Sequence, residues 1–312
     1  AGASPIRKAW AAGVQHPTIY AGVISTNAGE NWTDYGIYKV PTSDSGVFER
    51  VVESSEGANF GGGVGDGKTY TSVRYFTYYG MDFIQAYFYD IATWKEEETF
   101  KNIDLDLVAN DLSYDPVSGQ IYGCFYSKDA KDTWYFGTAD YRNGTRKTIA
   151  KVDRWNVLAI DKNGNAFAID YNGNLLSVDK ATGATTVIAS TGLKPYYPTT
   201  GTIDPRSGLL YWNLCPEDGH SYLYTVDTKT GKATYVTKFA NDEQLTGMYI
   251  PLPEAEELAP AAVSNLSLDF PQGALSGNVA FTAPTTTFNG EPAEGELSYT
   301  VVCSNGEEKT GK

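Results

Sequence analysis

Residues that bind metals or act as catalytic bases are scarce in this chain. Its 312 residues include two histidines, His16 and His220, and three cysteines, Cys124, Cys215 and Cys303. No Cys-x-x-Cys pair occurs, and no cysteine stands at a metal-binding spacing from a histidine, so no metal site is expected. Each cysteine lies in an apolar, strand-like run, which favours small buried side chains over reactive thiols.

Motifs of common catalytic and cofactor sites are also missing. The sequence contains no G-x-S-x-G, H-E-x-x-H, P-loop or kinase signature. The glycine-rich run at residues 60–68 (FGGGVGDGK) lacks the ending of a P-loop, and close approach of backbones is a simpler explanation for its glycines. The DKNGN turn at residues 161–165 lacks the ligand spacing of an EF-hand. No catalytic residue and no cofactor is predicted.

Basic residues and long apolar runs are few. The chain has 24 Lys and Arg against 38 Asp and Glu, and its formal charge of -14 repels phosphate backbones and anionic membranes. Nucleic acid is therefore not an expected partner. No apolar run approaches the roughly 20 residues that span a bilayer, and the opening AGASP is not a basic and apolar leader. We expect a soluble, mature polypeptide that does not span a membrane.

What the chain does contain is a repeat. The phrase DPVSGQIYGCFY, starting at Asp115, returns as DPRSGLLYWNLC at Asp204, and 204 minus 115 is 89 residues. A second pair, LLSVDKATGATTVI and LYTVDTKTGKATYV, places Asp179 and Asp227 48 residues apart. In each phrase an apolar strand ends in Asp, whose carboxylate can accept turn amides, and Gly supplies the positive φ of a hairpin turn.

The segment at residues 158–188 contains one whole unit, with four strands separated by three turns. A meander of this kind cannot bury both faces alone, and four-stranded units of about 40 to 50 residues are typical of a β-propeller. Blades are predicted at residues 61–101, 110–152, 157–189 and 198–239. Three strands near the N-terminus complete a fifth blade if Leu245 to Ile250 pairs with Ile19 to Ile24, which leaves no open sheet edge.

The predicted fold is therefore all-β: a five-bladed β-propeller over residues 1–250, with six blades as the alternative, closed by a C-terminal strand that joins the N-terminal blade. Residues 251–260, rich in Pro and Glu, are predicted to be a linker. The strands predicted in residues 261–312 resemble the first strands of a fibronectin type III domain. Because such sandwiches need about 100 residues, we expect a partial immunoglobulin-like module, either a truncated domain or a smaller β module.

Repeats of the form LxxIDxxxGxxYxxD and LYxVDxxTGxxTxV resemble those of secreted bacterial β-propeller surface proteins that carry fibronectin type III modules. The resemblance covers about residues 19–250 and 263–305. It implies an exported bacterial protein, secreted, on the outer cell surface or in the periplasm, that takes part in adhesion or glycan handling. A monomer is expected.

Aromatic residues in the connections that lead into inner strands are candidates for binding. Tyr196 and Tyr197 lie between prolines in KPYYPTT, Trp155 begins such a strand, and Asn59 and Phe60 precede another. Flat rings with polar rims bind sugar faces, with amides and carboxylates bonding the hydroxyls. The alternative is that these rings only fill the space between blades.

Polar candidates occur in two loops near the end of the predicted propeller. His220 lies in CPEDGHSY, and Asp242 and Glu243 directly precede an inner strand. The first hypothesis is a noncatalytic binding or adhesion module that recognises a glycan or a surface protein through the face formed by the connections into inner strands. The alternative is a lyase or hydrolase acting on polysaccharide or peptide, with these three residues as acid and base. The scarcity of histidine favours the first hypothesis; a third is that the propeller is only a spacer.

Overall fold

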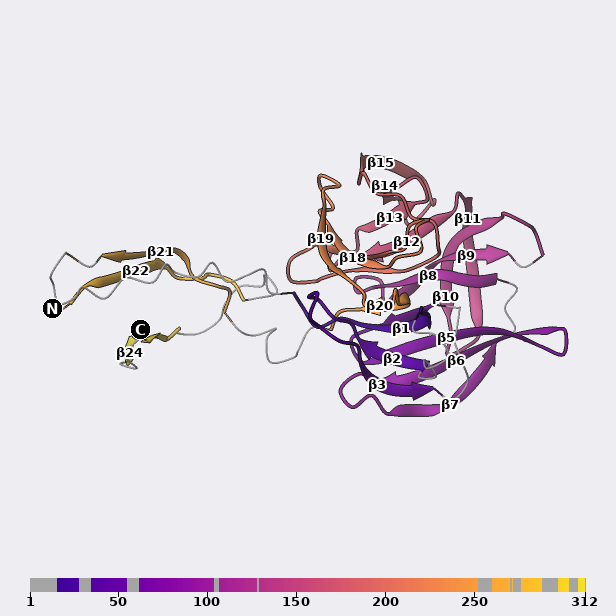
Figure 1. Cartoon of the computed structure of the whole chain (residues 1–312), viewed down its shortest axis with the longest axis horizontal. Coiled ribbons are helices and arrows are strands. Elements are labelled where there is room, and N and C mark those ends of the chain that lie inside the picture. The colour runs from indigo at the N-terminus through magenta and orange to yellow at the C-terminus, as the bar shows by residue number, and fades with distance from the viewer. Residues whose placement is uncertain are drawn as a thin grey trace. The chain divides into compact units, whose positions relative to one another are not determined.

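The computed structural model describes residues 16–27, 35–54, 62–103, 107–127, 129–251, 260–269, 271, 276–287, 297–302 and 308–311. Its regular elements in these ranges are β-strands (Figure 1). The described residues include no helix long and apolar enough to cross a membrane. The chain divides into two compact units, Ala1–Pro251 and Leu252–Lys312.

The first unit is a five-bladed β-propeller, made of five four-stranded sheets. Blade 1 contains β20 (Gln244–Tyr249), β1 (Tyr20–Ser25), β2 (Tyr35–Lys39) and β3 (Glu49–Ser54). Blade 2 contains β4 (Gly63–Gly65), β5 (Thr69–Tyr78), β6 (Met81–Asp90) and β7 (Glu96–Ile103). Blade 3 contains β8 (Leu107–Asp115), β9 (Gln120–Ser127), β10 (Trp134–Asp140) and β11 (Thr145–Val152). Blade 4 contains β12 (Trp155–Ile160), β13 (Ala166–Asp170), β14 (Asn174–Val178) and β15 (Thr185–Ser190). Blade 5 contains β16 (Gly201–Ile203), β17 (Leu210–Leu214), β18 (Tyr222–Val226) and β19 (Ala233–Lys238).

The inner strands form a ring in which β4, β8, β12, β16 and β20 contact one another in that order and β20 contacts β4. Asp111 and Ser113 of β8 accept hydrogen bonds from the backbone amides of Leu158 and Ile160 of β12. Because both partners advance by two residues, the two inner strands run in the same direction. The same end of every blade therefore carries equivalent turns.

We name the two ends of the ring by their turns. The top face carries the connections into inner strands and the turns between the second and third strands, with described segments 26–27, 79–80, 129–133, 153–154, 171–173, 191–200, 215–221 and 239–243. The bottom face carries the remaining turns, with segments 40–48, 66–68, 91–95, 116–119, 141–144, 161–165, 179–184, 204–209 and 227–232.

Blade 1 combines the two ends of the first unit, because β1 pairs antiparallel with β20 and Gly22 lies opposite Thr246. The inner strands are crowded here. Gly247 has a φ of 61°, and a Cβ at this position would lie 2.5 Å from the Cα of Gly63. The Tyr70 hydroxyl donates to the Gly247 carbonyl at 2.6 Å. A Cβ at position 63 would overlap the Tyr70 hydroxyl and lie 3.2 Å from the Cα of Gly247, so crowding by that side chain and by the backbone of β20 explains this glycine.

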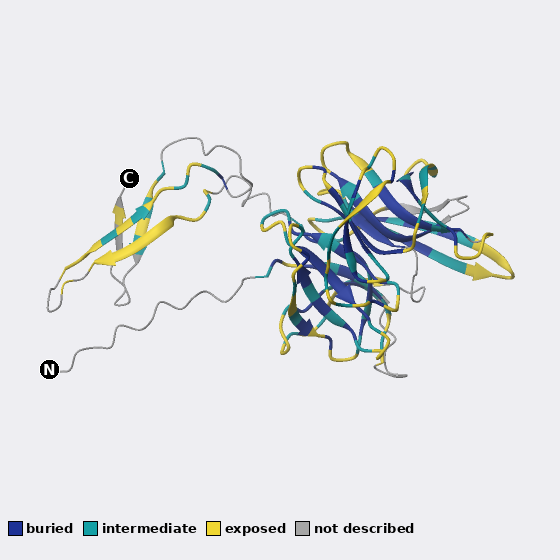
Figure 2. Ribbon diagram, turned by 90° about the horizontal axis from the view of Figure 1, so that it is seen from above, coloured by how far each residue is buried: buried dark blue, intermediate teal, exposed yellow. Residues whose placement is uncertain are grey.

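Apolar side chains are buried mainly between neighbouring blades, and each of the five blade interfaces has its own cluster. Figure 2 shows buried residues along the strands of this unit and exposed residues in many of its turns. Cys124 and Cys215 are buried, as predicted, and burial raises the pKa of both thiols to about 12. Cys303 lies outside the described residues. The clusters provide the hydrophobic stabilisation that a single meander lacks.

Residues in the turns between third and fourth strands also form ion pairs and hydrogen bonds with the preceding blade. Lys180 of blade 4 pairs with Asp115 of blade 3 at 2.5 Å, and the Asp115 side chain is fully buried. Arg142 of blade 3 pairs with Glu97 of blade 2 at 2.6 Å. Asp44 of blade 1 accepts a hydrogen bond from the Tyr235 hydroxyl of blade 5 at 2.7 Å. Polar contacts therefore supplement the apolar clusters at three interfaces.

The second unit does not show the expected sandwich. Its described strands form two separate two-stranded sheets, β21 (Ser264–Asp269) with β22 (Asn278–Thr282) and β23 (Tyr299–Val302) with β24 (Glu308–Gly311). Every residue of β21 is exposed, and the side chains of Leu266 and Leu268 are each 62% exposed. The described residues of this unit therefore do not bury the apolar layer that defines an immunoglobulin-like fold.

Candidate functional site

Tyr196 and Tyr197 lie on the top face, in the loop between β15 and β16. Their backbone amides both donate to the Cys215 carbonyl, at 3.0 and 3.1 Å. The Asn156 side chain donates to the Tyr197 carbonyl at 3.0 Å, and the Gln244 side chain donates to the Pro198 carbonyl. The loop backbone is thus bonded to blade 4, to blade 5 and to β20, which fixes the positions of both tyrosines.

The two rings themselves are open to solvent. Tyr196 is 53% exposed and Tyr197 is 40% exposed. Their ring centroids are 4.9 Å apart, with the ring planes at 74°. Because hydrogen bonds already order the supporting loop, the protein loses little conformational entropy when a ligand stacks on these rings.

His220 lies in the loop between β17 and β18 and contacts Asp242. Its Nδ1 is 3.0 Å from an Asp242 carboxylate oxygen. Asp242 also accepts hydrogen bonds from the Asn27 side chain, at 3.0 Å, and from the Ser221 amide, at 3.3 Å. Burial opposes ionisation of Asp242, but the hydrogen bonds from Asn27 and His220 outweigh it and keep the pKa of the carboxyl below its ordinary value. At neutral pH the site therefore holds an ionised acceptor beside a half-exposed imidazole.

The tyrosine loop and the His220 loop are directly connected. Cys215, which accepts the amides of Tyr196 and Tyr197, opens the loop that carries His220. The Asn27 amide donates to the Asn241 carbonyl at 2.8 Å, next to Asp242 in the chain. We call the connected set Asn27, Tyr196, Tyr197, His220 and Asp242 the Tyr–His surface.

Glu243 has a different position from its neighbour Asp242. It is only 2% exposed, and its carboxylate accepts hydrogen bonds from the Asn241 amide and side chain, both at 3.1 Å. These contacts hold the 239–243 loop in shape. Glu243 therefore supports the loop that carries Asp242 and does not offer its carboxylate to a ligand there.

Trp155 does not present its ring to solvent. It is 1% exposed and packs 5.6 Å from Phe136, in the apolar cluster between blades 3 and 4. The reason is local, because all six residues of β12 are buried. The alternative of a ring that fills the space between blades describes Trp155. Asn59 and Phe60 lie outside the described residues.

Sequence analysis did not single out two polar residues that the fold brings into use. Asn27 holds Asp242, although it lies 215 residues away in the chain. Asp111, in β8, is fully buried at the centre of the ring and accepts hydrogen bonds from the Leu158 amide at 3.0 Å and the Thr200 hydroxyl at 2.8 Å. Burial raises the pKa of Asp111 to about 8. An acidic residue inside an otherwise strand-like run was the available signal for Asp111; Asn27 offered none.

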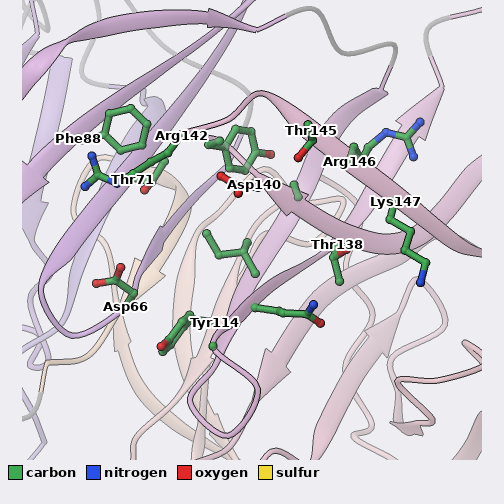
Figure 3. Close-up of a pocket in the computed structure, with 15 residues that line it drawn as sticks. Asp66, Thr71, Phe88, Tyr114, Thr138, Asp140, Arg142, Thr145, Arg146 and Lys147 are labelled. Carbon is green, nitrogen blue, oxygen red and sulfur yellow. The ribbon is translucent and has the colours of Figure 1, made fainter.

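A cleft of about 530 Å³ lies on the bottom face between blades 2 and 3. Figure 3 shows Arg142 beside Phe88 and Thr71 at one side of it. The Arg142 guanidinium stacks 4.4 Å from the Phe88 ring centroid and pairs with Glu97. Asp66, also in the lining, accepts the amides of Lys68 and Thr69 in its own turn. These charged groups stabilise turns and the blade interface, so the cleft is a weaker candidate than the Tyr–His surface.

Metal ligands do not gather in the described part of the chain, where no group of three His, Cys, Asp or Glu side chains could hold an ion. The Tyr–His surface contributes one imidazole and one carboxylate, which is fewer than a structural or catalytic metal site uses. The exposed rings of the Tyr–His surface can stack on a ligand, and its imidazole and carboxylate can form hydrogen bonds.

Comparison with known proteins gives similarity in fold alone. No protein-family model and no curated protein matches the sequence. A nidogen/laminin complex contains a chain that is 15% identical over 75% of this chain and 98% of its own, with a TM-score of 0.44. A putative 6-phosphogluconolactonase from Bacteroides fragilis is 11% identical over 76% of this chain and 98% of its own, with a TM-score of 0.41. Regucalcin from Agrobacterium tumefaciens, a calcium-binding protein, is 14% identical over 58% and 60%, with a TM-score of 0.36. No functional conclusion rests on these similarities.

Proposed function

We propose that the propeller is a noncatalytic binding module that recognises a glycan through the Tyr–His surface. The observation that carries this proposal is the pair of exposed tyrosine rings on a loop bonded to three neighbouring elements. Large exposed aromatic side chains do not stabilise the fold, and on an ordered support they are typical of recognition surfaces.

The polar groups beside the rings suit sugar hydroxyls. The ionised Asp242 carboxylate is an acceptor, and the half-exposed His220 imidazole can donate or accept. Aromatic faces that contact the CH groups of a sugar, next to a few polar groups that bond its hydroxyls, form the usual arrangement of a carbohydrate site. A protein ligand is the other candidate that such a surface fits.

A glycan microarray tests this function. We expect the wild-type chain to bind a defined set of glycans and the double variant Tyr196→Ala with Tyr197→Ala to lose that binding. Val117→Ala is the matched control, because Val117 is 67% exposed in a turn of the bottom face. Unchanged glycan binding by the tyrosine variant, with the fold intact, contradicts the proposal.

The contact between His220 and Asp242 supports one alternative, an enzyme in which Asp242 orients His220 as a general base. A lyase or hydrolase of this kind would cleave the polysaccharide or peptide that it binds. Incubation of bound substrates with wild type, His220→Gln and Asp242→Asn, followed by detection of new chain ends, distinguishes the two functions. Turnover that is lost in His220→Gln while binding remains reverses the ranking.

We further propose that the protein is exported and acts at a bacterial cell surface, and that residues 261–312 form a partial fibronectin type III-like module. Both proposals rest on the sequence resemblance. Protease treatment of intact cells, followed by immunoblotting, tests the location: a surface protein is degraded while a cytoplasmic marker is spared.

The pairing of β20 with β1 supports the related proposal that this C-terminal strand of the propeller holds the ring closed.

A further inference from the structure

The hairpin of β5 and β6 is longer than any other pair of middle strands in the propeller. Both strands have ten residues, whereas the second and third strands of the other blades have five to eight. It projects beyond the rest of the propeller in Figure 1. Its tip exposes large side chains: Tyr78 and Met81 are each 58% exposed, and Tyr79 is 86% exposed.

The projecting part is a braced ribbon. Phe76 and Phe83 lie opposite each other and stack with centroids 5.3 Å apart. One step closer to the tip, the Thr77 hydroxyl donates to the Asp82 carboxylate at 2.6 Å. Cross-strand contacts of this kind stabilise a hairpin. The tip therefore holds its aromatic side chains in a defined position.

The turn itself uses an unfavourable residue. Tyr79 and Gly80 form a two-residue turn with φ values of 49° and 75°, and Asn, Asp or Gly is favoured in a turn with two positive φ values. A bulky residue with positive φ costs conformational energy. In this chain Trp94 also has a positive φ, of 54°, but its ring packs 4.5 Å from Tyr20 and 5.6 Å from Tyr70.

Among the residues that the structure describes, no ring outside the hairpin tip packs against Tyr79 as Tyr20 and Tyr70 pack against Trp94. The aromatic neighbour of Tyr79 among the described residues is Tyr78, with centroids 4.4 Å apart, and Tyr78 is itself exposed. A strained residue persists where the surrounding structure holds it in place, as the paired and braced strands β5 and β6 hold Tyr79, and such residues cluster at binding and active sites. The position of Tyr79 therefore makes it a candidate contact for a ligand outside the chain.

The hairpin tip and the Tyr–His surface lie at the same end of the ring. The β5–β6 turn, at residues 79–80, is a turn between second and third strands, and Tyr196 and Tyr197 lie in a connection into an inner strand. Both kinds of segment belong to the top face. They belong to different blades, so only an extended ligand can contact both.

We propose that the hairpin tip is a second contact for the ligand of the Tyr–His surface, and that this ligand is a neutral polysaccharide chain. The inference rests on the proposed glycan-binding function. Exposed tyrosine rings at two places on one face fit separate sugar units of one long polymer, and two linked contacts strengthen binding without a deeper pocket. The formal charge of -14, with Asp82 at the tip and Asp242 in the surface, disfavours acidic polysaccharides.

The test compares chain lengths. Neutral and acidic polysaccharides, together with the matching oligosaccharides of about two to four units, are offered to wild type, Tyr79→Asn and Tyr79→Phe. For neutral polymers we expect Tyr79→Asn to bind about fivefold or more weakly, while its binding of the short oligosaccharides matches wild type. Tyr79→Phe, which keeps the ring, retains polymer binding. Val117→Asn, in a bottom-face turn, is the control and leaves both unchanged.

Thermal unfolding supplies a second readout that a merely structural role does not predict. Because Asn suits a positive φ better than Tyr does, Tyr79→Asn should raise the midpoint of thermal unfolding by about 2 °C while it weakens polymer binding. A lower midpoint contradicts the strain argument and overturns the inference.

The outcomes separate this inference from the proposed function. If no glycan of either length binds, the proposed function fails. If glycans bind and Tyr79→Asn affects both lengths equally, or neither, only the role of the hairpin is overturned. Preference for acidic polymers overturns the assigned ligand class. Binding to a glycoprotein that survives removal of its sugars identifies a protein ligand and overturns the inference as well.

Discussion

The two faces of the propeller use similar turns for different purposes. On the bottom face, Lys180 and Arg142 reach across to the preceding blade and form ion pairs there. On the top face, Tyr79, Tyr196 and Tyr197 leave their rings in solvent. The difference is that these bottom-face residues stabilise the ring, whereas these top-face rings are exposed, as the proposed binding function requires. Substitutions in the inner ring and on the bottom face should therefore change stability, and substitutions on the top face should change binding.

The largest effect is expected in the inner ring that joins the two faces. Gly247→Val puts a branched side chain at a φ of 61° and against the backbone of Gly63. Strain and overlap together should lower the free energy of unfolding by about 4 kcal/mol, as measured by urea denaturation followed by circular dichroism.

Gly208→Ala is the control for this substitution. Gly208 has a φ of 72°, and a Cβ there would meet nothing within 4 Å, so only the conformational cost of about 1 kcal/mol remains. Equal losses for the two variants contradict the role assigned to crowding between β20 and β4, and with it the proposed closure of the ring by β20.

On the bottom face, Lys180→Met should cost about 2 kcal/mol, because it leaves the Asp115 carboxylate buried without its cation. Burial opposes ionisation of Asp115, but hydrogen bonds from Lys180, Ser118 and the Val117 amide keep its pKa below the ordinary value. A depressed pKa in the folded state gives stability that is present above the unfolded pKa of about 4 and is lost as the pH falls.

Urea denaturation at several values between roughly pH 3 and pH 7, a range that spans the ordinary pKa of a carboxyl group, checks this prediction. The difference between wild type and Lys180→Met should shrink at the acid end. Lys229→Met, in the corresponding turn of blade 5, changes an exposed lysine and should have little effect. A difference that does not depend on pH contradicts an ionic role for the Lys180 contact.

Asp111 offers a pH-dependent effect at the centre of the ring. Burial raises its pKa to about 8 in the folded state, so the unfolded chain holds fewer protons on this group between pH about 4 and about 8. The contribution of Asp111 to stability is complete below the unfolded pKa and declines as the pH rises through this window. Asp111→Asn, which mimics the protonated group, should flatten the pH profile; an unchanged profile contradicts a raised pKa.

The smallest effect on stability is expected at the Tyr–His surface. Tyr196→Ala with Tyr197→Ala should change the free energy of unfolding by no more than about 0.5 kcal/mol, since both rings are exposed and the loop is held by backbone contacts. Thermal and urea unfolding measure this value. A loss as large as that of Lys180→Met means that the rings stabilise the fold, which removes the contrast between the faces.

Sequence reasoning predicted the all-β class and the five blades because each blade is written in consecutive residues. The Asp-x-x-x-Gly turns are seen in the structure: Asp179 and Asp227 accept turn amides, and Gly183 and Gly231 have positive φ. In the second unit the same reasoning predicted part of a sandwich, whereas the described residues form two separate two-stranded sheets. Short strands are recognisable locally, but a sandwich depends on pairing between distant segments.

For the site, position in the repeat was a better guide than residue type. The connection into an inner strand does present Tyr196 and Tyr197 with exposed rings, but the same argument also selected Trp155, which is buried between blades. Glu243 was paired with Asp242 because the two are adjacent, yet successive residues point in different directions and only Asp242 meets His220.

By itself, the sequence determined the units of this protein: the strands, the turns that join them and the need to stack the copies. These follow from hydrophobic patterning and turn chemistry, which act over a few residues. Only the tertiary structure decided which aromatic rings are exposed and which polar groups meet, such as Asn27 with Asp242 and Asp111 with Thr200. Burial and hydrogen bonding of that kind depend on the neighbouring blade, which is supplied by residues far away in the chain.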